Sequence, residues 1–220
     1  MKIRCSYYTH SLLSLCIILF LGVSKEAFSQ EVKLNPISIG VKVGASLTSF
    51  EHSYNYSQVI KPVFGIYANK YLTPRLSGQI GVDYASYASK DAVPPIIAEE
   101  TLRYIQLNAK AHYLIKNYSG IPVFLGGGIF AGKLTEAMIT SYDVTQAERT
   151  YFKDNATSVF KPINVGFSLS GELRIPVNRH QIVAGVEYTK GLSPTYKKTS
   201  AQVQDLTRTK SIGLYLSFLF

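Results

Sequence analysis

The chain has 220 residues, of which 23 are lysine or arginine and 14 are acidic, so its formal net charge is +9. The cations are scattered, with only Lys197 and Lys198 adjacent, which excludes the clustered basic surface of a nucleic-acid-binding protein. Both cysteines, Cys5 and Cys16, lie close to the N-terminus, so the rest of the chain can form neither a disulfide nor a thiolate metal site.

The first 29 residues have the three-part form of a secretory signal peptide. A lysine and an arginine precede a mostly apolar run at residues 12–23, which is too short for a typical membrane-spanning helix. The small side chains of Ala27 and Ser29 then flank one bulky residue, which is the pattern that signal peptidase cleaves. We predict cleavage between Ser29 and Gln30, with an uncleaved N-terminal anchor as the alternative. Residues 30–220 would form a single domain with a net charge of +7, because cleavage removes three cations and one anion.

After residue 30 the dominant pattern is an alternation of apolar and polar side chains in segments of about ten residues, the length of a tilted strand that crosses a bilayer. In residues 37–47 every odd position is apolar and every even position is small or polar. Residues 64–72 repeat the pattern, with Lys70 as the one charged residue on the apolar face. Residues 79–84 and 104–115 are the third and fourth predicted strands.

The fifth predicted strand, residues 123–134, contains the run FLGGGIFAG, and its glycines leave open which positions face which side. The alternation resumes in residues 163–175 and 181–188, the sixth and seventh predicted strands. The eighth covers residues 211–220 and reaches the last residue of the sequence.

The connections between these strands alternate in length. Short turns are predicted at residues 73–75, 117–120 and 176–180. Long polar loops are predicted at residues 51–61, 90–100, 136–160 and 191–208. Long loops at one edge and short turns at the other are typical of a transmembrane barrel. The sequence therefore predicts an all-β fold, an antiparallel up-and-down β-barrel of eight strands with both termini in the periplasm.

A soluble lipocalin-like barrel or a β-sandwich would also show alternating strands. Charges at mid-strand positions of the polar face favour the membrane barrel, because a soluble barrel would have to bury them in an apolar core. The sequence has 16 tyrosines and no tryptophan. Several of the tyrosines lie near the ends of predicted strands, where an interfacial girdle of aromatic residues would lie. They are Tyr71, Tyr87, Tyr104, Tyr113 and Tyr188. We predict an integral protein of the outer membrane of a Gram-negative bacterium.

The last predicted strand has apolar residues at alternate positions up to an aromatic residue. These residues are Ile212, Leu214, Leu216, Phe218 and Phe220. The arrangement is similar to the signal by which outer-membrane barrels are recognised for assembly, so the barrel-assembly machinery and outer-membrane lipid are expected partners.

The sequence resembles the PorT-like outer-membrane β-barrel family of Gram-negative bacteria over nearly the whole of residues 30–220. The segments that carry the resemblance are FSQ, VKVGASLTSF, LRYIQLNAKAHYLIK, IPVFLGGGIFAG, VAGVEYTKGL and IGLYLSFLF. Asn108 stands where family members commonly carry proline. The resemblance implies an outer-membrane location but no single activity, since members include secretion-system accessories.

Seven ionisable residues on the polar faces form a predicted lumen charge network. They are Lys42, Asp83, Lys110, His112, Glu172, Arg174 and Glu187. An eight-stranded barrel has room inside only for side chains, so we expect these groups to pair into a plug rather than to line a pore. The alternative is a proton-responsive gate in which His112 titrates.

An active site is not indicated by the sequence. His52 could lie near Ser53, Ser57, Glu51 or Glu99 at the outer rim, but their spacing does not define a catalytic triad. We predict no catalytic residue, metal or cofactor.

The expected function is that of a non-enzymatic barrel that acts through protein contacts, as an accessory of an envelope or secretion complex or as a surface recognition protein. Its longest predicted loop, residues 136–160, is the expected contact region. The alternatives are a small-solute channel and a lipid-modifying enzyme.

Overall fold

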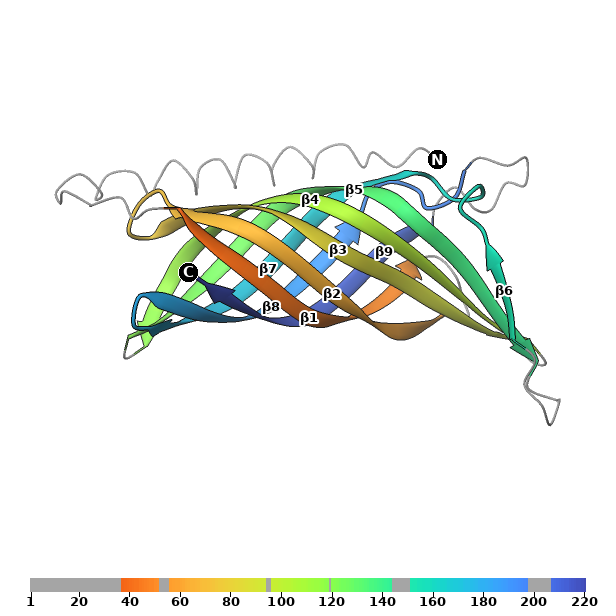
Figure 1. The fold of residues 1–220 in the computed structure, drawn as a ribbon, viewed down its shortest axis with the longest axis horizontal. Helices are drawn as coiled ribbons and strands as arrows, with labels where there is room; N and C mark the ends of the chain where they lie inside the picture. The colour runs from red at the N-terminus through yellow and green to blue at the C-terminus, as the bar shows by residue number, and fades with distance from the viewer. Residues whose placement is uncertain (1–36, 52–55, 94–95, 119, 144–150, 198–206) are drawn as a thin grey trace, which may run out of the picture. The chain divides into compact units, whose positions relative to one another are not determined.

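The computed structural model describes residues 37–220 except 52–55, 94–95, 119, 144–150 and 198–206 (Figure 1). The predicted signal peptide and its cleavage residues Ala27, Ser29 and Gln30 lie outside the described residues. Within the described part, no helix is long and apolar enough to cross a membrane.

The described residues form nine β-strands. Their bounds are β1 (Ser38–Glu51), β2 (Tyr56–Tyr71), β3 (Leu76–Val93), β4 (Ile96–Tyr118), β5 (Ile121–Asp143), β6 (Tyr151–Asn155), β7 (Ile163–Val177), β8 (His180–Gly191) and β9 (Arg208–Leu219). All pairings between them are antiparallel.

Eight of these strands close into a barrel (Figure 1). The ring runs from β1 through β2, β3, β4, β5, β7 and β8 to β9, which pairs again with β1. Two backbone hydrogen bonds between Ile39 and Phe220, of 3.1 and 2.9 Å, continue this closing ladder. The predicted closed antiparallel barrel of eight strands is confirmed. The short strand β6 lies outside the ring and pairs with the far end of β5.

The three short turns lie where the sequence predicts them, between β2 and β3, β4 and β5, and β7 and β8. We call this edge of the barrel the short-turn end and the opposite edge the long-loop end. At the turn between β7 and β8, Asn178 has a positive φ of 55°, which asparagine tolerates better than most residues.

The predicted long loop at residues 136–160 is wrong for much of its length. β5 continues to Asp143, and residues 151–155 form β6. Likewise β3 extends to Val93 and β4 begins at Ile96, so the predicted loop 90–100 is mostly strand. β2 begins at Tyr56, within the predicted loop 51–61. Beyond the bilayer the outer face of a strand meets water, so apolar residues no longer alternate there and the sequence has the composition of a loop.

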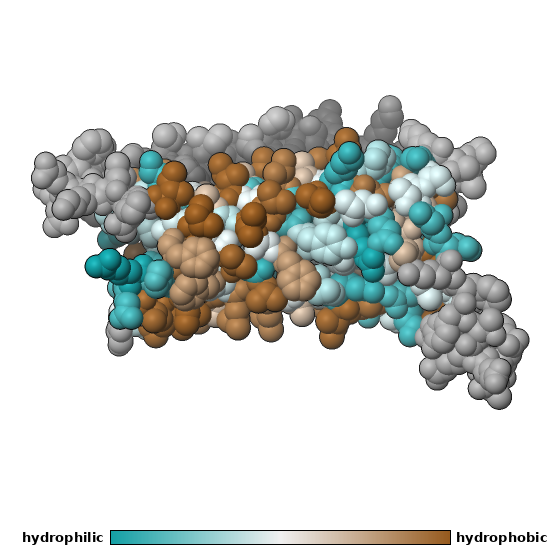
Figure 2. Space-filling model, in the orientation of Figure 1, coloured by the Kyte–Doolittle hydropathy of each residue, from teal (hydrophilic) through white to brown (hydrophobic). Residues whose placement is uncertain are grey.

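The barrel has an apolar exterior and a polar interior. Ile80, Ile129 and Leu214 face outward and are 69%, 68% and 70% exposed, whereas lysines, carboxylates and amides on the opposite faces are buried. Figure 2 shows hydrophobic side chains over the middle of the visible face and hydrophilic ones toward both ends. A soluble barrel would have the reverse distribution, whereas an apolar band around a polar interior is the arrangement of outer-membrane barrels. The protein is an integral outer-membrane β-barrel.

The structure decides the facing of β5, which the sequence left open. Phe124 and Phe130 point inward and are buried, while Leu125 and Ile129 point outward. The even-numbered glycines are therefore on the inner face. A Cβ on Gly128 would overlap the main chain of Ala109 and Lys110, so only glycine fits there.

Replacing Gly128 with alanine should lower the free energy of unfolding by about 1–3 kcal/mol or more, because the added methyl group has no space beside β4. The matched control is Gly127→Ala. Its methyl group would point outward and meet nothing closer than Leu169, at 3.7 Å. Denaturant titration of both refolded proteins measures the difference, and equal stabilities would show that the assigned facing of β5 is incorrect.

Candidate functional site

All seven residues of the predicted lumen charge network lie inside the barrel. Lys42 is on β1, Asp83 on β3, Lys110 and His112 on β4, Glu172 and Arg174 on β7, and Glu187 on β8. Their side chains are at most 12% exposed. Each stands on the inward face because alternate residues of a strand point to the same side of the sheet. The structure brings them together in two clusters.

The central cluster joins two lysines to two carboxylates. Lys42 Nζ lies 2.6 Å from Asp83 Oδ2 and 3.5 Å from Glu187 Oε2. Lys110 Nζ donates a hydrogen bond to the other oxygen of Glu187. The cluster is therefore electrically neutral, and Glu187 is the shared partner of two cations from different strands.

The second cluster, nearer the short-turn end, is built around Glu172. Arg174 donates two hydrogen bonds to Glu172 Oε2, of 3.0 Å from Nε and 2.8 Å from Nη2. The other carboxylate oxygen accepts a hydrogen bond of 2.7 Å from the hydroxyl of Tyr215. The Arg174 guanidinium also lies 4.1 Å from the ring centre of Phe124 and donates to Tyr71 Oη at 3.1 Å. Hydrogen bonds and ring contacts thus surround both charges of this buried pair.

His112 belongs to the second cluster. It is fully buried, with Nε2 3.1 Å from Glu172 Oε1 and 3.2 Å from Ser170 Oγ. Glu172 therefore contacts a guanidinium, a tyrosine hydroxyl and an imidazole together. This position is compatible with both hypotheses for His112, a structural partner or a titrating gate, and the gate stays a prediction.

Little space is left between these side chains. A cavity of about 40 Å³ lies beside the central cluster. Its lining includes Asn108, Ser168 and Thr189. Such a volume holds only one or a few water molecules, so the described side chains fill the lumen at this level.

A third group of interior residues closes the long-loop end, and sequence reasoning missed it. This outer cluster consists of Phe50, Ala85, Tyr87, Leu102, Tyr104, Leu134, Ala137, Ala156, Phe160 and Tyr196. Most of its strand residues lie at or near the ends of the predicted strands or in predicted loops. Tyr87 and Tyr104, predicted for an interfacial girdle, are instead buried inside the barrel, so the girdle prediction is wrong for these two residues. The aromatic residues of the predicted loops, Phe160 above all, were the available signal.

Two loop segments, one between β6 and β7 and one between β8 and β9, contribute residues of the outer cluster at the opening of the barrel. Phe160 and Tyr196 form a β-bridge, and their ring centres are 4.9 Å apart. The hydroxyl of Tyr196 donates to Glu100 Oε2 at 2.5 Å, which ties this cap to β4. Below it, Tyr87 and Tyr104 pack edge to face with ring centres 6.0 Å apart. The interior is thus polar and ion-paired in the membrane part and aromatic at the long-loop end.

The structure describes only some of the rim residues considered for catalysis. His52 and Ser53 lie outside the described residues, and Ser57 is exposed on β2. Glu51 pairs with Lys190, and Glu99 pairs with Lys61. Within the described ranges, no group of three or more histidine, cysteine or acidic residues could hold a metal ion.

The predicted assembly signal lies on the outward face of β9 and at its end. Ile212, Leu214, Leu216, Phe218 and Phe220 are all exposed on the barrel exterior. β9 also pairs with both β1 and β8, so this strand closes the ring. Its role in recognition by the assembly machinery stays a prediction.

Comparison with known proteins finds similarity in structure only. No protein-family model matches the sequence, and no curated protein matches it. Neisserial surface protein A is 10% identical, with a TM-score of 0.47 over 84% of this chain and 97% of that one. The attachment invasion locus protein Ail of Yersinia pestis is 12% identical, with a TM-score of 0.44 over 84% of this chain and 100% of that one. The outer-membrane protein OprG of Pseudomonas aeruginosa is 10% identical, with a TM-score of 0.41 over 84% and 96%.

Proposed function

We propose that this protein is a non-enzymatic, non-conducting outer-membrane barrel that acts through protein contacts at its long-loop end. The observation that carries the proposal is the double obstruction of the interior. The two ion-paired clusters fill the membrane part, and the outer cluster covers the long-loop end. A solute would have to separate buried ion pairs and displace packed aromatic rings to pass.

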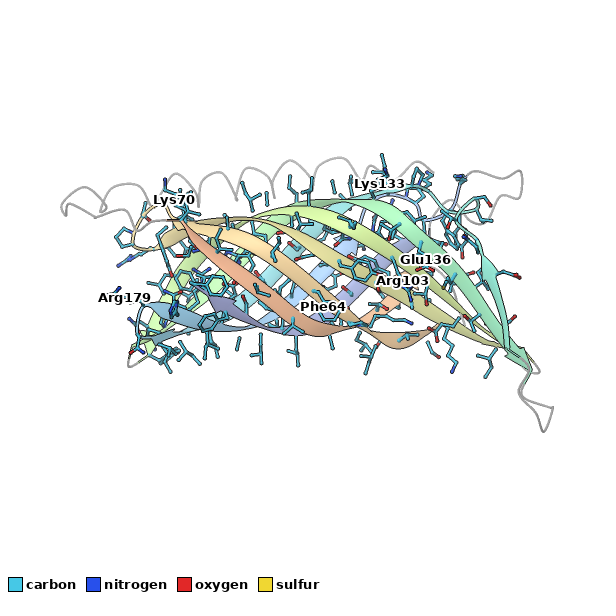
Figure 3. The ribbon with its side chains drawn as sticks, in the orientation of Figure 1. Phe64, Lys70, Arg103, Lys133, Glu136 and Arg179 are labelled. Carbon is cyan, nitrogen blue, oxygen red and sulfur yellow. The ribbon has the colours of Figure 1, made fainter. Side chains whose placement is uncertain are left out.

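The long-loop end is suited to protein contacts because its strands project well beyond a bilayer. β4 and β5 have 23 residues each, whereas about 9–11 residues cross a membrane. Ion pairs join the strands at this end, with Arg103 of β4 bonded to Glu136 of β5 and Glu99 of β4 to Lys61 of β2. Figure 3 shows Arg103 and Glu136 near this end of the barrel. The projecting strands form an ordered, hydrated surface that a partner could bind.

The resemblance to PorT-like barrels supports a more specific form of this proposal, an accessory of a secretion or envelope complex. Surface recognition is the other form. In both, the barrel anchors the projecting strands and transports nothing.

Planar-bilayer recording tests the closed interior. Purified, refolded protein should give no steady conductance at moderate voltage, because the ion pairs and the outer cluster leave no continuous path. A refolded porin recorded in the same bilayers is the positive control. Steady single-channel steps from the wild-type protein would contradict the proposal and favour the small-solute channel.

Single-cysteine labelling tests which end is exposed at the cell surface. Both natural cysteines lie in the predicted signal peptide, so Thr135→Cys on β5 and Pro74→Cys in a short turn would each be the only thiol of the mature protein. With both termini in the periplasm, a membrane-impermeant maleimide should label the first in intact cells and the second only after the envelope is opened. The reverse pattern would show that the predicted orientation is wrong.

The same Thr135→Cys protein, carrying a photo-activatable cross-linker, tests the partner. We expect a discrete cross-linked species in intact cells, and no such species from Pro74→Cys. Recovery of the barrel alone from both proteins would count against function through protein contacts at the long-loop end.

A further inference from the structure

Among the described residues, the exposed charged side chains at the short-turn end are all cationic, and the carboxyl group of Phe220 is the one anion there. The cationic residues are Lys70, Arg75, Lys116 and Arg179. At least one of them lies in each short turn or on the strand end beside it, so they are spread around the barrel as a collar. Figure 3 shows Lys70 and Arg179 at this end. Within the described part of the chain, none of the four forms an ion pair with an acidic side chain.

The acidic side chains are segregated in the opposite sense. Among the described residues, Asp83, Glu172 and Glu187 are inside the barrel, and all other acidic residues belong to the long-loop end. Three of the acidic residues at the long-loop end, Glu51, Glu99 and Glu136, form ion pairs with cations there. Among the described residues, the long-loop end thus carries both cations and carboxylates, whereas the side chains of the short-turn end carry cations alone.

The collar lies at the margin of the apolar band. On β7, Ile175 and Val177 are exposed apolar residues separated from Arg179 by Asn178. On β4, Ile115 directly precedes Lys116. Lys116 Nζ lies 4.5 Å from the ring centre of Tyr118, which is itself 55% exposed. Exposed aromatic rings beside cations mark the level of lipid headgroups on such barrels.

A second aromatic group stands at the same level on the other side of the ring. The ring of His180 lies 5.2 Å from that of Phe218 and 6.5 Å from that of Phe220, measured between centres. Tyr118 thus accompanies Lys116 on β4, and the ring of His180, at the start of β8, directly follows Arg179. Their position assigns the collar to the headgroup layer rather than to the aqueous space beyond it.

From this arrangement we propose that the collar binds the phosphate groups of anionic phospholipids in the leaflet at the short-turn end. Lysine and arginine stems can lie along the apolar margin while their charged groups reach the phosphate layer. A negatively charged headgroup supplies the anions that the described side chains at this end do not. This inference goes beyond the proposed function, since it does not depend on any protein partner.

Electron spin resonance of spin-labelled lipids tests the proposal on the whole mature barrel in phosphatidylcholine bilayers. The probes are spin-labelled phosphatidylglycerol and spin-labelled phosphatidylcholine, whose ratio of association constants is measured. We expect a preference for phosphatidylglycerol of about fivefold, falling to near one in the variant K70Q/R75Q/K116Q/R179Q. Arginine and lysine are replaced by glutamine to keep side-chain length and polarity.

The matched control removes four lysines from the long-loop end, as K133Q/K161Q/K197Q/K210Q. This variant should keep the preference for phosphatidylglycerol, although it has lost the same number of charges. An equal loss in both variants would show that net charge alone attracts the lipid, and would overturn the proposal. So would a wild-type protein with no preference.

Salt dependence provides a measurement that needs no variant. About 1 M salt shortens the screening length to about 3 Å, so the preference of the wild-type barrel should largely disappear. A preference unchanged by salt would contradict binding by the charged collar. Gel mobility with and without boiling confirms that each variant has folded before its lipid preference is compared.

Discussion

Glu187→Gln should lower the free energy of unfolding of the barrel by about 3–5 kcal/mol. Glu187 is the carboxylate that contacts both Lys42 and Lys110 in the central cluster. Lys42 retains Asp83 at 2.6 Å, but Lys110 loses its acidic partner while its side chain stays only 3% exposed. A buried ammonium group without a counter-charge is far more costly than the lost attraction alone. Denaturant titration of the refolded protein, followed by tyrosine fluorescence or gel mobility, measures the change.

Two further variants separate this effect from general damage. Adding Lys110→Met to Glu187→Gln removes the stranded cation and should restore most of the lost stability. Glu99→Gln breaks the Lys61–Glu99 pair, whose side chains are 20% and 29% exposed, and should cost less than about 1 kcal/mol. If Glu187→Gln were no worse than Glu99→Gln, the interior ion pairs would not be the desolvated network that the structure shows.

Phe160→Ala should destabilise the outer cluster by about 3–5 kcal/mol. The side chain of Phe160 is fully buried and packs against Tyr196, so its removal leaves a cavity in the cap of the long-loop end. Because the membrane part of the barrel is packed separately, we expect the loss to be concentrated at this end. Hydrogen exchange should increase at residues 156–161 and 192–197, with little change in β9.

The neighbouring Val159→Ala is the matched control for this prediction. Val159 is 44% exposed, so shortening it should change exchange only slightly. The same two variants in planar bilayers separate the two obstructions. Phe160→Ala should stay non-conducting, since the ion-paired clusters remain in place. Equal exchange in both variants would show that Phe160 does not hold the cap together.

Sequence reasoning predicted the transmembrane strands well and their extensions poorly. Residues 37–47 alternate because one face meets lipid and the other the lumen, and the pattern ends where the lipid ends. β4 and β5 nevertheless continue as one ladder to the pairing of Ile96 with Asp143. Backbone pairing does not require alternating hydrophobicity, so the region of residues 136–143 was indistinguishable from a loop. The outer cluster was missed for the same reason, since Ala137 and Phe160 lie in the predicted loop.

The run FLGGGIFAG shows a different limit. Glycine has no side chain to mark a face, so the assignment depends on the strands beside it. Phe124 and Phe130 are as hydrophobic as any lipid-facing residue, yet both are inside, where Phe124 packs against Arg174. The position of Phe124 is thus explained by its contact with the buried guanidinium and not by the polarity of the face on which it lies.

By itself the sequence determined how many strands cross the membrane, that the charged residues point inward and, outside the glycine-rich β5, which residues share a face. The two-residue period of a strand and the contrast between lipid and lumen are both local properties. Only the tertiary structure decided which charges meet. Glu187 lies between Lys42 and Lys110 because closure of the ring brings β1, β4 and β8 to face one another across the lumen. Thr48 of β1 likewise bonds the backbone of Ala88 on β3, at the place where the register of β2 and β3 shifts. Such partners are set by curvature and register, which depend on all eight strands together.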